Sequence, residues 1–221
     1  MTSQTANEGG LPGLITKPGV FSSKQHDTCN QRVDFALKHN PYVKLMLEAM
    51  KSTGCAINRD RHIVCEPCNP GSPIQGGFDP INNQIVICEN KTPTQRVMSS
   101  LLTHELIHAF DHCRAKVDWT DLTHVACSEI RAASLSSDCS FLSTNIYGFN
   151  YGIKKHHQKC VRNHARRSIQ ATRDLSKEDA EKAIDSVWDS CFNDFAPFDR
   201  IPQGPSDARR ARSSKYYSQS L

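Results

Sequence analysis

The chain has 221 residues, of which 38% are hydrophobic and 7% aromatic, and its formal net charge is +4. This length suits one domain with a sizeable core and polar ends, and so mild a positive charge gives no indication of a nucleic-acid partner. No stretch approaches the apolar length of a membrane span, and the N-terminus resembles neither a secretory signal nor an Arg-rich transit peptide.

Ten cysteines are the most prominent feature of the composition. An even number in a chain of this size favours disulfides formed in an oxidising compartment. Without a signal peptide or presequence, that compartment is expected to be the mitochondrial intermembrane space, where oxidation traps small proteins. The alternative is a reducing cytosol, with free thiols or a second zinc site. The cysteines are Cys29, Cys55, Cys65, Cys68, Cys88, Cys113, Cys127, Cys139, Cys160 and Cys191.

The N-terminal quarter of the chain predicts a polar segment followed by two helices. Residues 1–27 are rich in Gly, Pro, Ser and Thr, a composition typical of disorder. A helical pair follows, interrupted at Pro41 and ending at Gly54. We expect both helices to be packing elements.

A short strand is predicted over residues 61–68, and it carries the CxxC pair Cys65 and Cys68. A zinc ribbon requires a second CxxC, which the chain lacks. A redox pair requires a helix N-terminus beside the first cysteine, which Pro67 disfavours. The sequence therefore favours structural disulfides from these two cysteines to others.

Two more strands are predicted over residues 77–80 and 84–88, around a turn at Asn82 and Asn83. In zincins the strand before the zinc helix commonly lines the cleft, where an extended substrate pairs with its edge. We assign that role to residues 84–88, with a purely structural strand as the alternative.

The motif HELIH occupies residues 104–108. Residues four apart share a face of a helix, so His104 and His108 can direct their rings at one metal ion. Glu105, next to the first histidine, can act as the general base of a zinc protease.

The local sequence places this motif in a helix rather than a loop. Thr92 suits the N-cap and Pro93 the first helical position, and Gln95 completes a capping box. Apolar residues then recur at helical spacing, which predicts a mostly buried helix from Pro93 to Arg114. A buried helix with two His and one Glu at metal spacing indicates a single catalytic zinc ion.

A zinc protease centre needs a third protein ligand, for which Glu129 is the prediction. Twenty residues separate it from His108, and it lies on a helix predicted over residues 126–135. The small Ala132 and Ala133 would let this helix pack closely against the zinc helix.

Three other residues compete for this role. His112 lies two turns beyond His104, about 12 Å along the helix axis, which is too far for one metal ion. We therefore expect His112 in the core or beside a ligand. Asp111 is predicted to orient a ligand histidine, or else to be a cap or surface charge. His124 remains an alternative ligand.

Residues 151–171 form a basic segment in which Lys155, Lys159, Arg162 and Arg166 share a helical face. Such a face can contact anionic lipid at a membrane surface. A solvated face is the commoner use of this pattern.

The chain ends in one more helix, opened by Ser176, and a polar basic tail typical of disorder. The predicted fold class is α+β, mainly helical. It comprises a zincin-like single domain over residues 28–201, with a small β-hairpin or sheet before the HExxH helix. Residues 1–27 and 202–221 are the predicted disordered ends.

Several segments together resemble a family of mitochondrial inner-membrane HExxH proteases. The resemblance covers about residues 27–202, and the combination is far more specific than HExxH alone. The matching segments are 103–114, 76–79, 118–119, 126–133, 138–139, 156–157, 191–194 and 197–198.

The resemblance implies zinc at His104 and His108, with Glu105 catalytic, and disulfide-bonded cysteines. It implies peripheral attachment to the inner membrane on the intermembrane-space side, and with it the oxidative import machinery as a partner. The implied substrate is the precursor of a mitochondrially encoded ATP synthase subunit. The family also assists assembly of the synthase membrane sector, separably from proteolysis.

The predicted reaction is metal-assisted peptide hydrolysis, in which Glu105 takes a proton from water and passes it to the leaving amine. A stabiliser of the oxyanion is also expected. The sequence does not rank its candidates, which are Tyr147, Tyr151, His124, His156 and His157.

Two rival functions are a disulfide-rich assembly chaperone with a non-catalytic zinc site and a nuclear or cytosolic zincin acting on DNA-bound proteins. Glu105 counts against the first, because a structural site has no need of that carboxylate. The modest charge and the ten cysteines count against the second.

Overall fold

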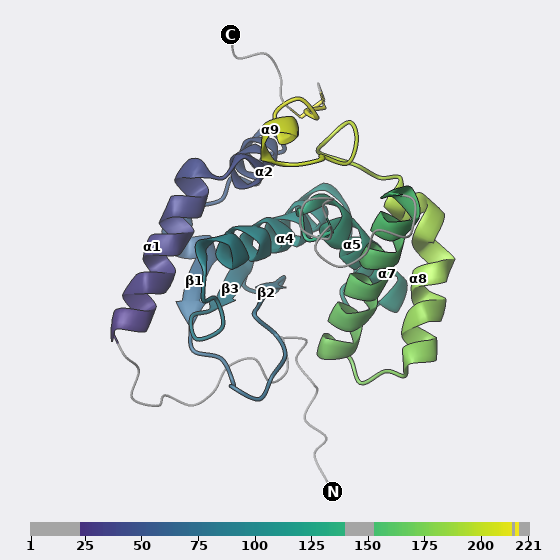
Figure 1. Ribbon diagram of the computed structural model, residues 1–221, viewed down its shortest axis with the longest axis horizontal. Helices are drawn as coiled ribbons and strands as arrows, with labels where there is room; N and C mark the ends of the chain where they lie inside the picture. Colours follow the sequence, from purple (N-terminus) through teal and green to yellow (C-terminus); the bar gives the residue numbers. More distant parts are fainter. Residues whose placement is uncertain (1–22, 140–152, 214, 217–221) are drawn as a thin grey trace, which may run out of the picture.

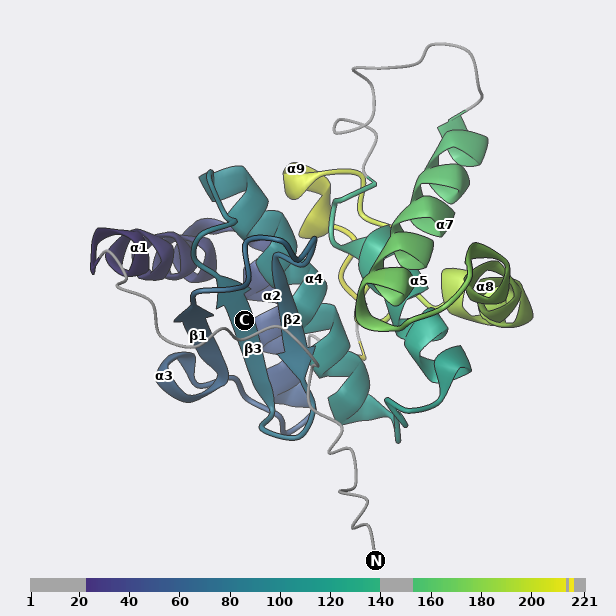
Figure 2. The same cartoon turned by 90° about the horizontal axis from the view of Figure 1, so that it is seen from below.

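Helix α4 (Gln95–Arg114) runs through the middle of the fold, between a sheet with two helices and a group of three later helices (Figures 1 and 2). The computed structural model describes residues 23–139, 153–213 and 215–216. On the first side lie α1 (Ser23–His39), α2 (Pro41–Ser52), the short α3 (Arg59–His62) and the three strands. On the second lie α5 (Leu122–Leu135), α7 (Ile153–Thr172) and α8 (Lys177–Phe192). The mainly helical α+β prediction is confirmed.

Helix α4 begins two residues later than predicted. Thr94, not Thr92, is its N-cap, and the Thr94 side chain accepts a hydrogen bond from the backbone N of Val97 at 3.3 Å. Thr92 is unsuited to this role because it is buried against the preceding turn, where its carbonyl accepts a hydrogen bond from Arg32. The cap assignment was wrong, but the long buried helix is confirmed.

The sheet contains β1 (Ile63–Glu66), β2 (Gly76–Asp79) and β3 (Gln84–Cys88) in the order β1-β3-β2. β2 and β3 form the predicted antiparallel hairpin, and β1 pairs with β3 in parallel. The turn is completed by Asn83, whose φ of 51° lies in the left-handed region that Asn tolerates. Because β3 is paired on both sides, its backbone cannot pair with a substrate. Our assignment of residues 84–88 to that role was wrong, and the edge strand beside α4 is β2.

Two large hydrophobic clusters form most of the core of the described structure, and a third, small one surrounds the Cys68–Cys88 disulfide. Of the two large clusters, one joins α1, α2, the sheet and α4, and the other joins α5, α7 and α8. Helix α5 contributes to both, with Ala132 in the first cluster and Ala133 in the second. Small side chains on both faces thus let α5 lie between α4 and the last two helices.

All ten cysteines form disulfides, which confirms the prediction of a disulfide-bonded chain. Cys65 and Cys68 are not bonded to each other, so the CxxC is neither a redox pair nor half of a zinc knuckle. The five pairs are Cys29–Cys65, Cys55–Cys113, Cys68–Cys88, Cys127–Cys191 and Cys139–Cys160.

Ordered structure extends beyond the predicted domain at both ends. Helix α1 begins at Ser23, inside the segment that composition assigned to disorder. After residue 201 the chain forms α9 (Pro205–Ala208), beside α2 in Figure 1. Tyr216 is buried with its ring 5.4 Å from that of Phe110. Apolar burial against the first core cluster therefore orders part of a tail whose composition is polar.

The arginines of the basic face of α7 are paired within the protein. Arg162 forms an ion pair with Asp185 and lies over the ring of Trp188, 4.0 Å from its centroid. Arg166 lies 3.9 Å from Glu181 on α8. This pairing favours the solvated face over the lipid-binding one. Among the described helices, none combines the length and apolar character needed to cross a membrane.

Candidate active site

Helices α4 and α5 bring His104, His108 and Glu129 together, with one candidate ligand atom of each within 4.8 Å of the others. The Nε2 atom of His104 lies 3.4 Å from Oε2 of Glu129. The Nε2 atom of His108 lies 3.7 Å from Oε1 of the same carboxylate. The three residues that the sequence analysis selected as ligands thus face one another.

This arrangement fits a tetrahedral metal ion. Ligand atoms about 2.0–2.1 Å from a tetrahedral zinc lie about 3.3 Å from one another, close to the separations observed here. Oε2 of Glu129 is buried without a hydrogen-bond partner in the described structure. A buried carboxylate oxygen in that state requires a compensating charge or donor, and a cation between the three side chains would supply it.

The histidine rings are held with their Nε2 atoms toward Glu129. Nδ1 of His104 lies 3.2 Å from a carboxylate oxygen of Asp138, which can only accept a hydrogen bond when ionised. Nδ1 of His108 lies 2.7 Å from Oγ of Ser128. The Ser128 hydroxyl donates to Asp111 at 3.0 Å, so it accepts from His108. Both rings therefore carry their proton on Nδ1, which leaves Nε2 free to bind a metal.

A buried ion pair lies behind His108. Arg131 is 1% exposed, and its Nε donates to both carboxylate oxygens of Asp111 at 3.0 Å. Its terminal nitrogens donate to the backbone carbonyls of Asp194 and Ala196. Asp111 thus orients His108 through Ser128, as the prediction of an orienting role required.

Glu105 is buried beside the three converging side chains. Burial raises the pKa of Glu105 to about 7. The charge of His104 opposes this rise, the charges of Glu129 and Asp138 add to it, and a hydrogen bond with the backbone of Phe78 opposes it. A carboxyl group with a pKa near neutrality can both accept and return a proton, which is the requirement for a general base that later acts as an acid.

The pKa values of the two ligand histidines are shifted in opposite directions by burial and by the carboxylates around them. Burial lowers the pKa of His108 to about 4, so this ring is neutral at physiological pH. Burial also acts to lower the pKa of His104, but the neighbouring carboxylates of Asp138 and Glu129 outweigh it and raise that pKa well above its usual value. The carboxylates therefore attract positive charge strongly, and a metal ion would replace the proton.

The side chains open onto a cleft of about 1630 Å³. Its walls come from β2, α4, α5 and α7, and it is lined by Gly76, Gly77, Trp119 and Arg167 among others. The edge strand β2 faces this cleft, where an extended peptide can pair with its backbone.

The alternative ligands lie in other environments. Nδ1 of His112 accepts a hydrogen bond from the Trp119 indole at 3.1 Å, and its ring lies 5.5 Å from that of Phe78. His112 is therefore partly buried among aromatic side chains and is not one of the converging ligands. Nδ1 of His124 accepts from the backbone of Asp118, away from the cluster.

Among the described oxyanion candidates, none lines the cleft. Tyr147 and Tyr151 lie outside the described residues. His157 contacts Ser134 and the backbone of Cys139 instead. His156, like His157 and His124, is absent from the cleft lining.

Sequence reasoning gave no role to Asp138 and Ser128, which hydrogen-bond to the ligand histidines. It also missed Ser168, which donates a hydrogen bond to Glu129, and His164, which lines the cleft. Their signal was weak: Ser168 and His164 are four apart on α7, and Ser128 precedes Glu129.

The sequence profile of the Peptidase M76 family matches residues 27–199. The chain belongs to this family. A human protein called mitochondrial inner membrane protease ATP23 homolog is 51% identical over 208 residues, covering 90% of this chain and 83% of its own. The zebrafish protein of the same name is 54% identical over 184 residues, covering 83% and 71%. The fission yeast (Schizosaccharomyces pombe) mitochondrial inner membrane protease atp23 is 38% identical over 180 residues, covering 81% and 95%. No solved structure matches the chain.

This M76 chain is therefore a protease, and the metallo-type chemistry of its site is consistent with the family. The names of its relatives indicate the mitochondrial inner membrane. These findings confirm the resemblance drawn from the short motifs.

Proposed function

We propose that the chain is a zinc-dependent endopeptidase at the intermembrane-space side of the mitochondrial inner membrane. There it would bind peripherally and mature a mitochondrially encoded ATP synthase subunit, with a separable role in assembly of the synthase membrane sector. The family membership and the motif resemblance support this proposal. Five disulfides support an oxidising compartment and import coupled to oxidation.

The observation that carries the proposal is the convergence of His104, His108 and Glu129 on one point, where an oxygen of the Glu129 carboxylate is buried without a hydrogen bond. These three side chains would hold the zinc ion. When bound, zinc supplies Lewis acidity, which polarises a carbonyl and lowers the pKa of water.

Glu105 performs the proton transfers in the proposed mechanism. Its carboxylate accepts a proton from the attacking water as the water oxygen bonds to the scissile carbonyl carbon. The same group then gives this proton to the amine nitrogen as the C–N bond breaks. The burial that raises the pKa of Glu105 to about 7 suits a group that must do both.

The edge strand β2 positions the substrate. Its unpaired side lies along the cleft, and Gly76 and Gly77 let a peptide approach the backbone closely. Pairing with β2 would lay the scissile bond across Glu105, which contacts the β2 residue Phe78 through a backbone hydrogen bond.

Two variants distinguish the assigned base, Glu105, from the assigned third ligand, Glu129. Glu105→Gln should retain stoichiometric zinc and abolish cleavage, because the ligands remain and the base is lost. Glu129→Ala should lose both zinc affinity and activity, because two histidines alone complete only half of the coordination sphere.

Zinc content is measured by atomic absorption, and proteolysis on labelled casein. Full proteolysis by Glu105→Gln would refute the mechanism, and stoichiometric zinc in Glu129→Ala would exclude Glu129 as ligand. Assembly activity should survive in Glu105→Gln, and its loss in this folded variant would contradict a separable role.

A further inference from the structure

His164 lies on α7 in the wall of the same cleft that contains His104 and Glu105. Its side chain lines the cleft and is partly accessible to solvent there. Its position relative to the reacting atoms follows from its neighbours along α7.

One anchor of α7 is at Ser168. Its hydroxyl donates a hydrogen bond of 2.6 Å to Oε1 of Glu129, the proposed third ligand. Residues four apart lie on the same face of a helix, about 6 Å apart along its axis. His164 therefore lies one turn from Ser168 on the face that is directed at Glu129.

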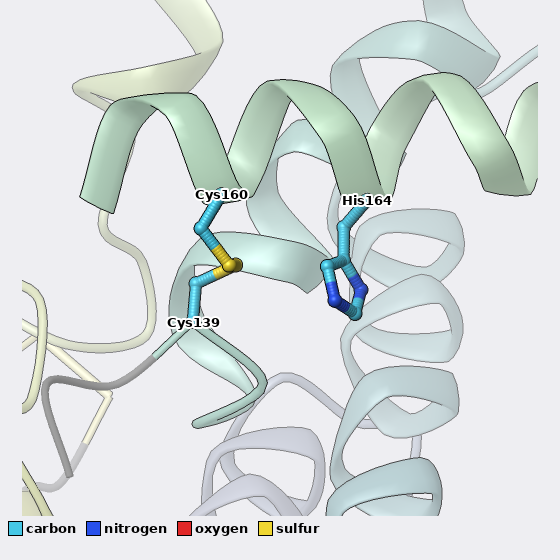
Figure 3. A group of neighbouring side chains, drawn as sticks. All are labelled: Cys139, Cys160 and His164. Carbon is cyan, nitrogen blue, oxygen red and sulfur yellow. A yellow bond between two sulfur atoms is a disulfide. The ribbon is translucent and has the colours of Figure 1, made fainter. Parts of the chain in front are cut away.

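The second anchor is at Cys160, one turn before His164. Cys160 is bonded to Cys139, and the residue before Cys139 is Asp138, which hydrogen-bonds to His104. Figure 3 shows the disulfide and the His164 ring on the same side of α7. His164 is thus held between a link to Glu129 and a link to the partner of His104.

The disulfide also excludes a second metal site at this position in the oxidised chain. A ring nitrogen of His164 and the two sulfur atoms lie within 4.8 Å of one another. Metal binding requires thiolates, and these sulfurs are bonded to each other. In the oxidised chain His164 is therefore not committed to a metal ion at this position, and it lines the cleft.

The pKa of His164 depends on the charged groups of the site. Burial lowers this pKa, and the charges of Asp138, His104 and Glu129 also act on it. This agrees with the short separation between His164 and those three residues that the two anchors require. As a neutral imidazole, His164 retains one N–H donor.

We propose that His164 donates this N–H to the oxygen of the scissile carbonyl as negative charge develops there. The inference rests on the proposed protease centre. His164 keeps its proton throughout, because the proton from water travels through Glu105 to the leaving amine. Loss of a single donor to such an oxygen typically lowers kcat about 10²–10³-fold.

The test compares three variants of the full-length oxidised protein on labelled casein. His164→Phe keeps a ring but removes the donor, and kcat should fall roughly 10²–10³-fold with KM and zinc content unchanged. His164→Gln retains an N–H donor and should recover part of this loss. His156→Ala, on the same helix but outside the cleft lining, should leave kcat unchanged.

The outcomes separate this proposal from the proposed function. If His164→Phe keeps kcat within a few-fold while Glu105→Gln is inactive, the role of His164 is refuted and the protease centre stands. If His164→Phe loses zinc or raises KM instead of lowering kcat, its role is structural and the proposal also fails. If Glu105→Gln remains fully active, the protease centre fails, and the inference fails with it.

Discussion

Replacing Arg131 with Met should destabilise the protein strongly while changing little of its shape. Met is close in length to the aliphatic part of Arg, so packing is largely retained. The charge is lost from a site that is 1% exposed, and Asp111, itself 3% exposed, loses its buried partner. Two backbone carbonyls, of Asp194 and Ala196, also lose their donors.

The magnitude follows from the cost of removing the buried partner of Asp111, which then keeps only the partly exposed Arg114 as a neighbouring cation. Removing one partner of a buried ion pair costs about 3–5 kcal/mol, against a total stability of about 5–15 kcal/mol for a typical domain. At about 2–4 °C per kcal/mol for a chain of this size, Tm should fall by roughly 6–20 °C. Urea unfolding of the oxidised protein, followed by circular dichroism, measures the free energy directly.

Arg114 provides the matched control. It also pairs with Asp111, at 3.0 Å, but its side chain is 22% exposed. Arg114→Met should cost no more than about 1 kcal/mol, because Asp111 keeps its buried partner Arg131 and the lost side chain is partly exposed. The reasoning is refuted if Arg131→Met loses less than about 1 kcal/mol, or no more than Arg114→Met.

Two further predictions concern the edge strand and the disulfides. A Cβ at Gly76 would lie 2.7 Å from the backbone carbonyl of Val86. Gly76→Ala should therefore displace β2, destabilise the protein by about 1–3 kcal/mol and lower casein cleavage. In the control Gly71→Ala, the added Cβ would lie 3.5 Å from the Asn69 side chain, so stability and cleavage should be unchanged. Normal stability and activity in Gly76→Ala would contradict the role of β2. Alkylation of denatured, unreduced protein should modify essentially no cysteine, as mass measurement would show; several free thiols would contradict the pairing.

The sequence by itself determined the residues whose relation is local. Helical geometry places His104 and His108 on one face four residues apart, with Glu105 between them, wherever the helix lies. Hydrophobic spacing likewise predicted the buried helix, and turn residues predicted the hairpin of β2 and β3. The oxidised state of the cysteines followed from their number and the absence of a second CxxC.

Only the tertiary structure decided relations between distant segments. β3 is the central strand, and β2 has a free edge, because β1 pairs with β3. A parallel pairing of this kind joins strands far apart in the chain, so the local sequence does not indicate it. The partners of the cysteines depend on contacts between segments far apart in the chain. Asp138 lies beside His104 and Ser168 beside Glu129 because α5 packs against α4, and α7 against α5. Composition also misjudged the tail, because burial of Ala208, Ala211 and Tyr216 requires a core surface that forms only when α2 and α4 have met. Local spacing thus places side chains on a helix face, whereas the surroundings of that face arise from contacts between residues far apart in the chain.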